Sequence, residues 1–130
     1  MSTAYGFSKK LDATFEQALE KATAVLKGQG FGVLTEIDVQ ATLKKKLGVD
    51  YRRYVILGAC NPPLAHQALL AELEIGLLLP CNVIVYETED GGSVVSAMNP
   101  GAAMELVGNP ELTKVAQLVT AKLQQMVDGL

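Results

Sequence analysis

A capped amphipathic segment between two short strand-like segments is the feature that most restricts what this chain can fold into. Thr14 and Gln17 have the spacing of a helix capping box. Over Phe15–Leu26 the apolar residues recur at helical intervals, and charged residues take the opposite side. The flanking residues 3–8 and 31–37 have the character of strands. A strand, a helix and a strand joined so closely predict a right-handed crossover unit.

The rest of the chain alternates between further helical and strand-like segments. Gly28 and Gly30 are expected to end the first helix by adopting left-handed conformations. Helices are predicted over residues 39–47, 62–74 and from 110 onward, a short turn or helix over 102–107, and strands over 51–59, 83–86 and 94–97. An extended return segment is expected at 75–79 and a hairpin turn at 89–92. These elements predict one α+β domain over residues 1–130, with about five strands in a largely antiparallel sheet.

Composition and charge argue against several classes of function. Apolar residues make up 49% of the chain and aromatic residues only 5%, so we expect an aliphatic core that needs no disulfide or metal. The net charge of −3 argues against a nucleic-acid partner, and the run Lys44–Lys46 is interpreted as a solvated face rather than an anion site. The longest apolar run, Ile75–Pro80, is too short for a membrane span, and no signal-peptide pattern is present. We therefore expect a cytoplasmic protein with two free cysteines.

Chemically capable residues gather in one stretch of the sequence, Leu57–Asn82. Cys60-Asn61 lies near one end of this stretch and Cys81-Asn82 at the other, and the only histidine, His66, lies between them. Cys60 follows one predicted strand and Cys81 precedes the next. If these two strands are antiparallel neighbours, both cysteines lie at the same edge of the sheet, and His66 need not be far away. The stretch therefore locates a candidate site without naming a reaction.

The two cysteines and the asparagine each have a structural explanation as well as a functional one. Cys60 precedes a helix N-terminus, which can stabilise a thiolate, although a small buried side chain at a strand end is the commoner case. Asn61 could orient a ligand, but it fully qualifies as a helix cap. A disulfide between Cys60 and Cys81 is possible if the strands are antiparallel, and it would be a redox feature in a reducing cytoplasm.

A metal site is a further alternative. Cys60, Cys81 and His66 could together bind zinc or another thiophilic metal, although their spacing matches none of the common patterns. Asp38 or Glu72 could then supply a fourth ligand. Asp38 also qualifies as the N-cap of the following helix, which is the interpretation we prefer.

Four segments taken together resemble the uncharacterised family known as domain of unknown function number 302. They are Thr35–Asp38, Leu43–Gly48, Ile56–Pro62 and Leu79–Glu87. The resemblance extends over nearly the whole chain. It implies a strand-helix-four-strand-helix fold, similar to one half of the TATA-binding-protein architecture, with extra helices inserted between strands. It implies no DNA binding and brings no established activity, so no catalytic role can be carried over.

From these observations we predict a small non-enzymatic module that binds a ligand or another protein and forms a homodimer. Dimerisation is expected because one layer of helices would cover one sheet face, while the aliphatic composition leaves apolar surface to bury. The candidate binding residues are Cys60, Asn61, His66, Cys81, Asn82 and Asp38. The alternative is a thiol- or metal-dependent site at Cys60, Cys81 and His66. No cofactor, nucleic-acid or membrane partner is predicted, and whether the chain is an enzyme stays open.

Overall fold

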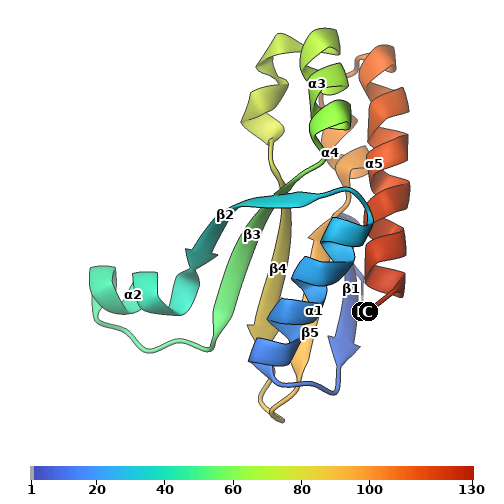
Figure 1. Cartoon of the computed structure of the whole chain (residues 1–130). Coiled ribbons are helices and arrows are strands. Elements are labelled where there is room, and N and C mark those ends of the chain that lie inside the picture. Colours follow the sequence, from blue (N-terminus) through green and yellow to red (C-terminus); the bar gives the residue numbers. More distant parts are fainter. Residues whose placement is uncertain (1) are drawn as a thin grey trace.

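Five antiparallel strands form one sheet, and most of the helices lie against one of its faces and beyond one of its ends (Figure 1). The computed structural model describes residues 2–130. Its elements are β1 (Gly6–Leu11), α1 (Phe15–Gly28), β2 (Gly32–Asp38), α2 (Val39–Leu47), β3 (Tyr54–Cys60), α3 (Pro62–Ala71), the 3₁₀ helix η1 (Leu73–Leu78), β4 (Cys81–Glu87), β5 (Ser93–Met98), α4 (Pro100–Met104) and α5 (Pro110–Asp128). The strand order is β1-β5-β4-β3-β2. The predicted α+β domain with a largely antiparallel sheet is therefore confirmed.

The first two strands of the chain form the two edges of this sheet. Every neighbouring pair of strands is antiparallel, so β1 and β2, four steps apart, run in the same direction. Helix α1 crosses one sheet face between them (Figure 1). The strands β5, β4 and β3 fill the space between the edges and supply the buried middle of the sheet.

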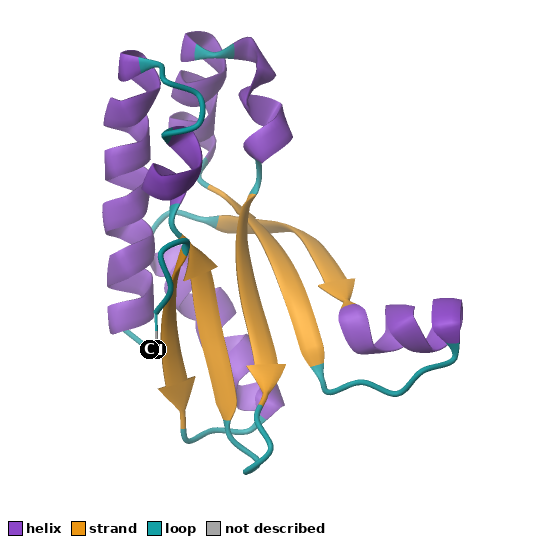
Figure 2. Cartoon of the chain, turned by 180° about the vertical axis from the view of Figure 1, so that it is seen from behind, coloured by secondary structure: helices purple, strands orange, loops and turns teal. Residues whose placement is uncertain are grey.

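The core lies between that face and helices α1 and α5. In the centre of the sheet Val55 and Leu57 of β3 lie opposite Val85 and Val83 of β4, and all four are buried. The two helices add buried side chains that are mostly aliphatic: Phe15, Ala18, Ala22, Leu26, Leu112, Leu123, Met126 and Val127. Burial of each large apolar side chain stabilises the fold by roughly 1.5–3 kcal/mol. In the part of the chain that the structure describes, no helix covers the opposite sheet face (Figure 2).

Helix α1 begins and ends largely as its sequence predicts. The Thr14 hydroxyl accepts a hydrogen bond from Gln17 N–H at 3.2 Å, and the Gln17 side chain accepts one from Thr14 N–H at 3.1 Å. This capping box satisfies two backbone donors that the first turn leaves free. At the other end only Gly30 is left-handed, with φ of 84°. The prediction for Gly28 was wrong, because Gly28 stays in the helix and Gln29 forms its C-cap.

Several element boundaries differ from the sequence prediction: β3 begins at Tyr54 rather than at residue 51, and α4 spans Pro100–Met104 rather than residues 102–107. Two further differences concern β1 and α3. The first strand spans Gly6–Leu11 rather than residues 3–8, because the whole of it pairs with β5. Helix α3 ends at Ala71, and the segment expected to return as an extended chain forms the 3₁₀ helix η1 instead. The side chain of Ile75 is only 1% exposed, so its burial favours a compact turn over an extended path. Among the helices described, none combines the length and apolar character needed to cross a membrane.

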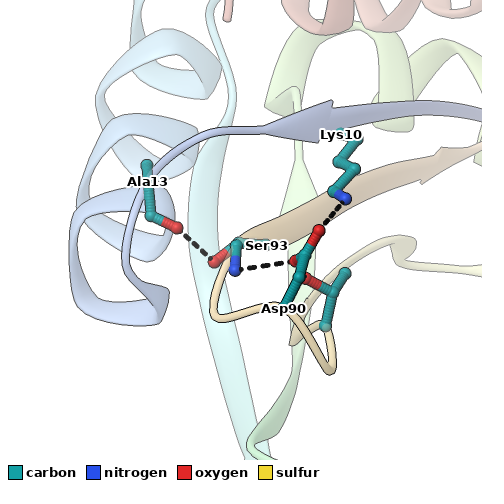
Figure 3. A network of polar contacts seen from close by, with 6 residues as sticks. Lys10, Ala13, Asp90 and Ser93 are labelled. Carbon is teal, nitrogen blue, oxygen red and sulfur yellow. Dashed lines mark hydrogen bonds and ion pairs between the residues drawn. The ribbon is translucent and has the colours of Figure 1, made fainter.

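A polar network fixes the turn between β4 and β5 against the start of the chain (Figure 3). The Asp90 carboxylate accepts hydrogen bonds from the Lys10 ammonium group and from Gly92 N–H. The hydrogen bond with Lys10 is the main reason that the pKa of Asp90 lies well below its usual value. Beside it the buried Ser93 hydroxyl donates to the Ala13 carbonyl oxygen at 3.0 Å. The hairpin predicted at residues 89–92 is therefore held to β1 and to the loop before α1.

Candidate functional site: an apolar cavity at one end of the sheet

The candidate site begins where β3 ends and α3 starts. Asn61 is the N-cap of α3, and its side-chain oxygen accepts from Leu64 N–H at the long distance of 3.4 Å. Pro62 and Pro63 occupy the first helical positions, where a missing N–H leaves no hydrogen bond unmade. This cap, which the sequence predicts, turns the chain sharply from the sheet into α3. The turn places one side of α3 above the ends of the central strands (Figure 1).

A cavity of about 350 Å³ lies between these strand ends and the helices beyond them. Its wall is formed by side chains of β2, β3, β4, α3, α4 and α5 and of the residues just before β2 and β4. The wall residues are almost all apolar and include Phe31, Leu34, Ala59, Leu64, Ala65, Ala68, Leu69, Leu79, Pro80, Met104, Val115, Ala116 and Val119. Apart from two cysteine thiols, Thr35 and Asn61 supply the polar side chains on the wall. An apolar hollow of this size is within the range of small-molecule sites.

Both cysteines lie on the wall of this cavity. Strands β3 and β4 are antiparallel neighbours, and Ala59 pairs with Cys81 in their register. Cys60 and Cys81 therefore lie together where β3 ends and β4 begins, at one end of the sheet, as the sequence predicts for antiparallel neighbours, and both are free thiols. Burial raises the pKa of the Cys81 thiol to about 11, with a smaller contribution from the neighbouring Cys60. Cys81 is therefore protonated at neutral pH, and a protonated thiol is a poor nucleophile.

The structure places the other three candidate residues elsewhere. His66 is exposed on α3 and Asn82 is exposed in β4, and neither lines the cavity. Asp38 lies at the far end of β2, where its side chain accepts from Ala41 N–H at 2.9 Å and caps α2. Of the six predicted residues, the cavity thus brings together Cys60, Asn61 and Cys81.

The geometry offers little support for the metal alternative. Within residues 2–130 no group of three histidine, cysteine or acidic side chains lies close enough together to hold a metal ion. Cys60 and Cys81 share the cavity wall, but His66 does not lie on it. Two thiols without a third ligand do not make a typical protein zinc site, which has three or four protein ligands.

Close packing at the cavity rim depends on a glycine that sequence reasoning missed. A Cβ atom at Gly58 would lie 2.1 Å from Thr35 Oγ1 and 2.9 Å from Pro80 Cγ. The pairing of β2 with β3 also shifts in register between Val33 and Thr35. Gly58 thus lets the irregular part of β2 and the residue before β4 approach β3 closely. Gly58 lies in the segment Ile56–Pro62 that carries the family resemblance, but the sequence does not indicate this contact, because it joins three segments that are distant in sequence.

The wall formed by α4 and α5 was also missed as part of a site. Met104 and Val119 line the cavity although they lie far along the chain from the two cysteines. Asn109 holds α3 and α5 together, because its side-chain nitrogen donates to the Ala71 carbonyl at 3.0 Å and to Glu72 Oε1 at 3.1 Å. The helical apolar stripe of α5 was visible in the sequence. Which part of it faces a cavity could be known only from the packing.

The sheet, the helices beyond its end and the apolar hollow between them define a small α+β domain with a cavity lined largely by aliphatic side chains. A family model described as "Domain of unknown function DUF302" matches residues 7–130. The chain belongs to this family, and the resemblance predicted from the sequence is confirmed.

A solved structure supports the same assignment. The chain is similar to an uncharacterized conserved DUF302 protein from Bacillus stearothermophilus, with a TM-score of 0.89 and 28% sequence identity. The match covers 97% of this chain and 98% of the other. No curated protein matches the chain.

Proposed function

We propose that this chain is a non-enzymatic module that binds a small apolar ligand in the cavity beside Cys60 and Cys81. The observation that carries the proposal is the almost entirely apolar lining of a hollow of about 350 Å³. At about 30 Å³ for each water-sized group, this space suits a ligand of roughly a dozen non-hydrogen atoms. Transfer of such a ligand from water to an apolar wall is favourable at about 25 cal/mol for each Å² of apolar surface buried.

The few polar groups on the wall restrict the ligand further. Thr35 and Asn61 are the polar side chains at the cavity, and neither is charged. A charged ligand would lose its hydration without gaining a partner of opposite charge. The wall therefore suits a hydrocarbon-like chain or ring with at most one uncharged polar end. A larger hollow of about 840 Å³ beside α4 and α5 is a weaker candidate, because Glu105, Gln117 and Gln124 line it.

The state of Cys81 supports binding over thiol chemistry. Its thiol is buried and its pKa is raised to about 11, whereas a reactive cysteine needs a lowered pKa and access to reagents. A thiol- or metal-dependent site at Cys60, Cys81 and His66 stays the alternative prediction. Native mass spectrometry of the purified protein distinguishes the two proposals, because a bound metal ion would favour the alternative.

Calorimetric titration with straight-chain alcohols of about six to twelve carbons tests the proposal, since these molecules span the size of the cavity. We expect saturable binding of at least one alcohol. Ala65→Phe adds a ring to the cavity wall and should weaken that binding by at least about tenfold, or ~1.4 kcal/mol. Ala24→Phe, at an exposed position of α1 outside the cavity, should leave it unchanged.

Two results of this titration would contradict the proposal. One is the absence of saturable binding for every alcohol in the series. The other is equal binding by Ala65→Phe and the unsubstituted protein. Thermal unfolding of both variants controls for loss of the fold, because Ala65 is only partly buried and its substitution is expected to be tolerated.

We also infer that the chain forms a homodimer. The open sheet face supports this inference, because exposed apolar surface on a small domain favours association. A cytoplasmic location and a likeness to one half of the TATA-binding-protein architecture stay predictions.

A further inference from the structure

One part of the chain projects from the body of the molecule. The edge strand β2, helix α2 and the loop that follows, residues 32–53, form an arm. Its strand pairs with β3 along one side, and α2 extends past this edge of the sheet (Figures 1 and 2). None of the nine residues of α2 is buried, and in β2 only Val33 is even partly covered. We call this segment the β2–α2 arm.

The β2–α2 arm carries apolar side chains that its own chain leaves in water. The exposed fractions are 48% for Ile37, 69% for Leu47 and 44% for Val49. Isolated helices shorter than about 12–15 residues are marginal in water, so a nine-residue helix needs packing against something else. Within the chain, α2 has its cap at Asp38 and an exposed ion pair between Lys44 and Asp50, which contributes little. The arm therefore lacks the burial that stabilises most protein helices.

Ile37 of the arm also belongs to a row of apolar residues on the adjoining sheet face. Ile37 lies opposite Ile56, and Ile56 lies opposite Ile84, so three isoleucines form a row across β2, β3 and β4. Next to this row the rings of Tyr54 and Tyr86 stack with centroids 5.5 Å apart. Figure 2 shows that no helix covers these strands on this side. We call the arm and this row together the arm surface.

The chain exposes more surface than a compact monomer of its mass is expected to expose. The chain exposes 7504 Å², whereas a compact monomer of 13.8 kDa is expected to expose about 6,600 Å². The excess of roughly 900 Å² is close to the ~800 Å² that each partner contributes to a stable interface. The projecting arm contributes to this excess, because no residue of α2 is buried and all residues of β2 except Val33 are exposed.

Charge favours a second copy of this chain as the partner. Helix α2 carries Lys44, Lys45 and Lys46 and no acidic residue, so its charge is +3. The arm with its loop, residues 32–53, also contains two arginines and three acidic residues, so its net charge is +2. Because the whole chain has a net charge of −3, the residues outside the arm carry −5. A basic arm on one copy and an acidic body on the other are complementary in both directions, as a two-fold dimer requires.

We propose that two copies of this chain associate through the arm surface, each placing its β2–α2 arm against the body of the other. The contact buries Ile37, Leu47 and Val49 and covers the row at Ile56 and Ile84. It gives each α2 the tertiary packing that its own chain does not supply. This proposal rests on the homodimer inferred above and adds the surface that forms it.

Sedimentation velocity across the micromolar range tests the proposal with the full chain. The unsubstituted protein should sediment as a species of twice 13.8 kDa. Leu47→Glu and, separately, Val49→Glu should each raise the dissociation constant by at least about tenfold, because each buries an unpaired charge in the interface. Leu70→Glu on α3, where the leucine is 75% exposed and distant from the arm, is the matched control and should leave the dimer intact.

The possible outcomes separate the two claims. A monomer at all concentrations would overturn both the homodimer and its surface. A dimer that neither Leu47→Glu nor Val49→Glu weakens would overturn the arm surface alone. Loss of the dimer with Leu70→Glu but not with the arm variants would place the interface on α3 instead. Circular dichroism of each variant confirms that the fold is retained, which is expected since all three leucine and valine positions are exposed.

Discussion

At the scale of single residues, the environment of Cys81 decides its chemistry. The side chain lies on the wall of an apolar cavity, and the lost hydration raises the pKa of its thiol to about 11. The sequence indicated that Cys60 and Cys81 would meet if their strands were antiparallel neighbours, because Cys60 follows one predicted strand and Cys81 precedes the next. It could not indicate their reactivity. That property depends on the aliphatic residues contributed by α3 and α5, which lie elsewhere in the chain.

The raised pKa of Cys81 predicts a loss of stability at alkaline pH. The thiol has a pKa near 9.0 in the unfolded chain and about 11 in the folded one, so folding favours the protonated form. This contribution is fully present below pH 9 and is lost as the pH rises through 11. Two pKa units correspond to roughly 2–3 kcal/mol. Relative to Cys81→Ala, the unsubstituted protein should therefore lose about this much free energy of unfolding between pH 8 and pH 11.

Urea denaturation of both proteins at a series of pH values measures this effect. Comparison with the variant cancels the other alkaline titrations, because tyrosines and lysines are common to both proteins. A difference in unfolding free energy that stays constant with pH would show that Cys81 titrates normally, and the burial argument would then be wrong.

At the scale of the elements, local signals located the helices and tertiary contacts determined their exact ends. Thr14, Asp38 and Asn61 each cap a helix as predicted, because a cap depends on only a few neighbouring residues. The prediction for η1 was wrong, because its compact turn buries Ile75 in the core. That burial depends on tertiary packing, which the local sequence does not show. The irregular pairing of β2 was missed for the same reason, because it depends on the contact at Gly58.

Substitution of Gly58 should disturb the rim of the cavity. In Gly58→Ala the new methyl group would overlap Thr35 Oγ1, 2.1 Å away, and would press on Pro80. We expect a loss of about 1–3 kcal/mol of unfolding free energy, which is the usual result of overpacking. Gly28→Ala is the matched control, because no atom lies within 4 Å of its added Cβ atom and the helix there tolerates alanine. Equal urea midpoints for Gly58→Ala and the unsubstituted protein would contradict the packing described at the rim.

At the scale of the whole molecule, the fold class and the end of the sheet that bears the candidate site were predictable, but the cavity was not. Alternating strands and helices and the aliphatic composition were sufficient to predict one antiparallel α+β domain. The cavity needs α5 to lie beside α3, a contact secured by Asn109 across a long stretch of sequence. His66 and Asn82 were predicted as site residues from sequence proximity alone, and the structure places them outside the cavity wall.

The measurement that tests the central claim most directly is a methyl-resonance NMR titration with the alcohol that binds most tightly. If the cavity binds it, the methyl signals of Leu64, Met104, Val115 and Val119 should shift together and saturate. The signals of Leu47 on the β2–α2 arm and of Leu106, 85% exposed outside the cavity, should stay in place. Shifts confined to exposed leucines, or shifts that increase without saturation, would contradict binding in the cavity and with it the proposed function.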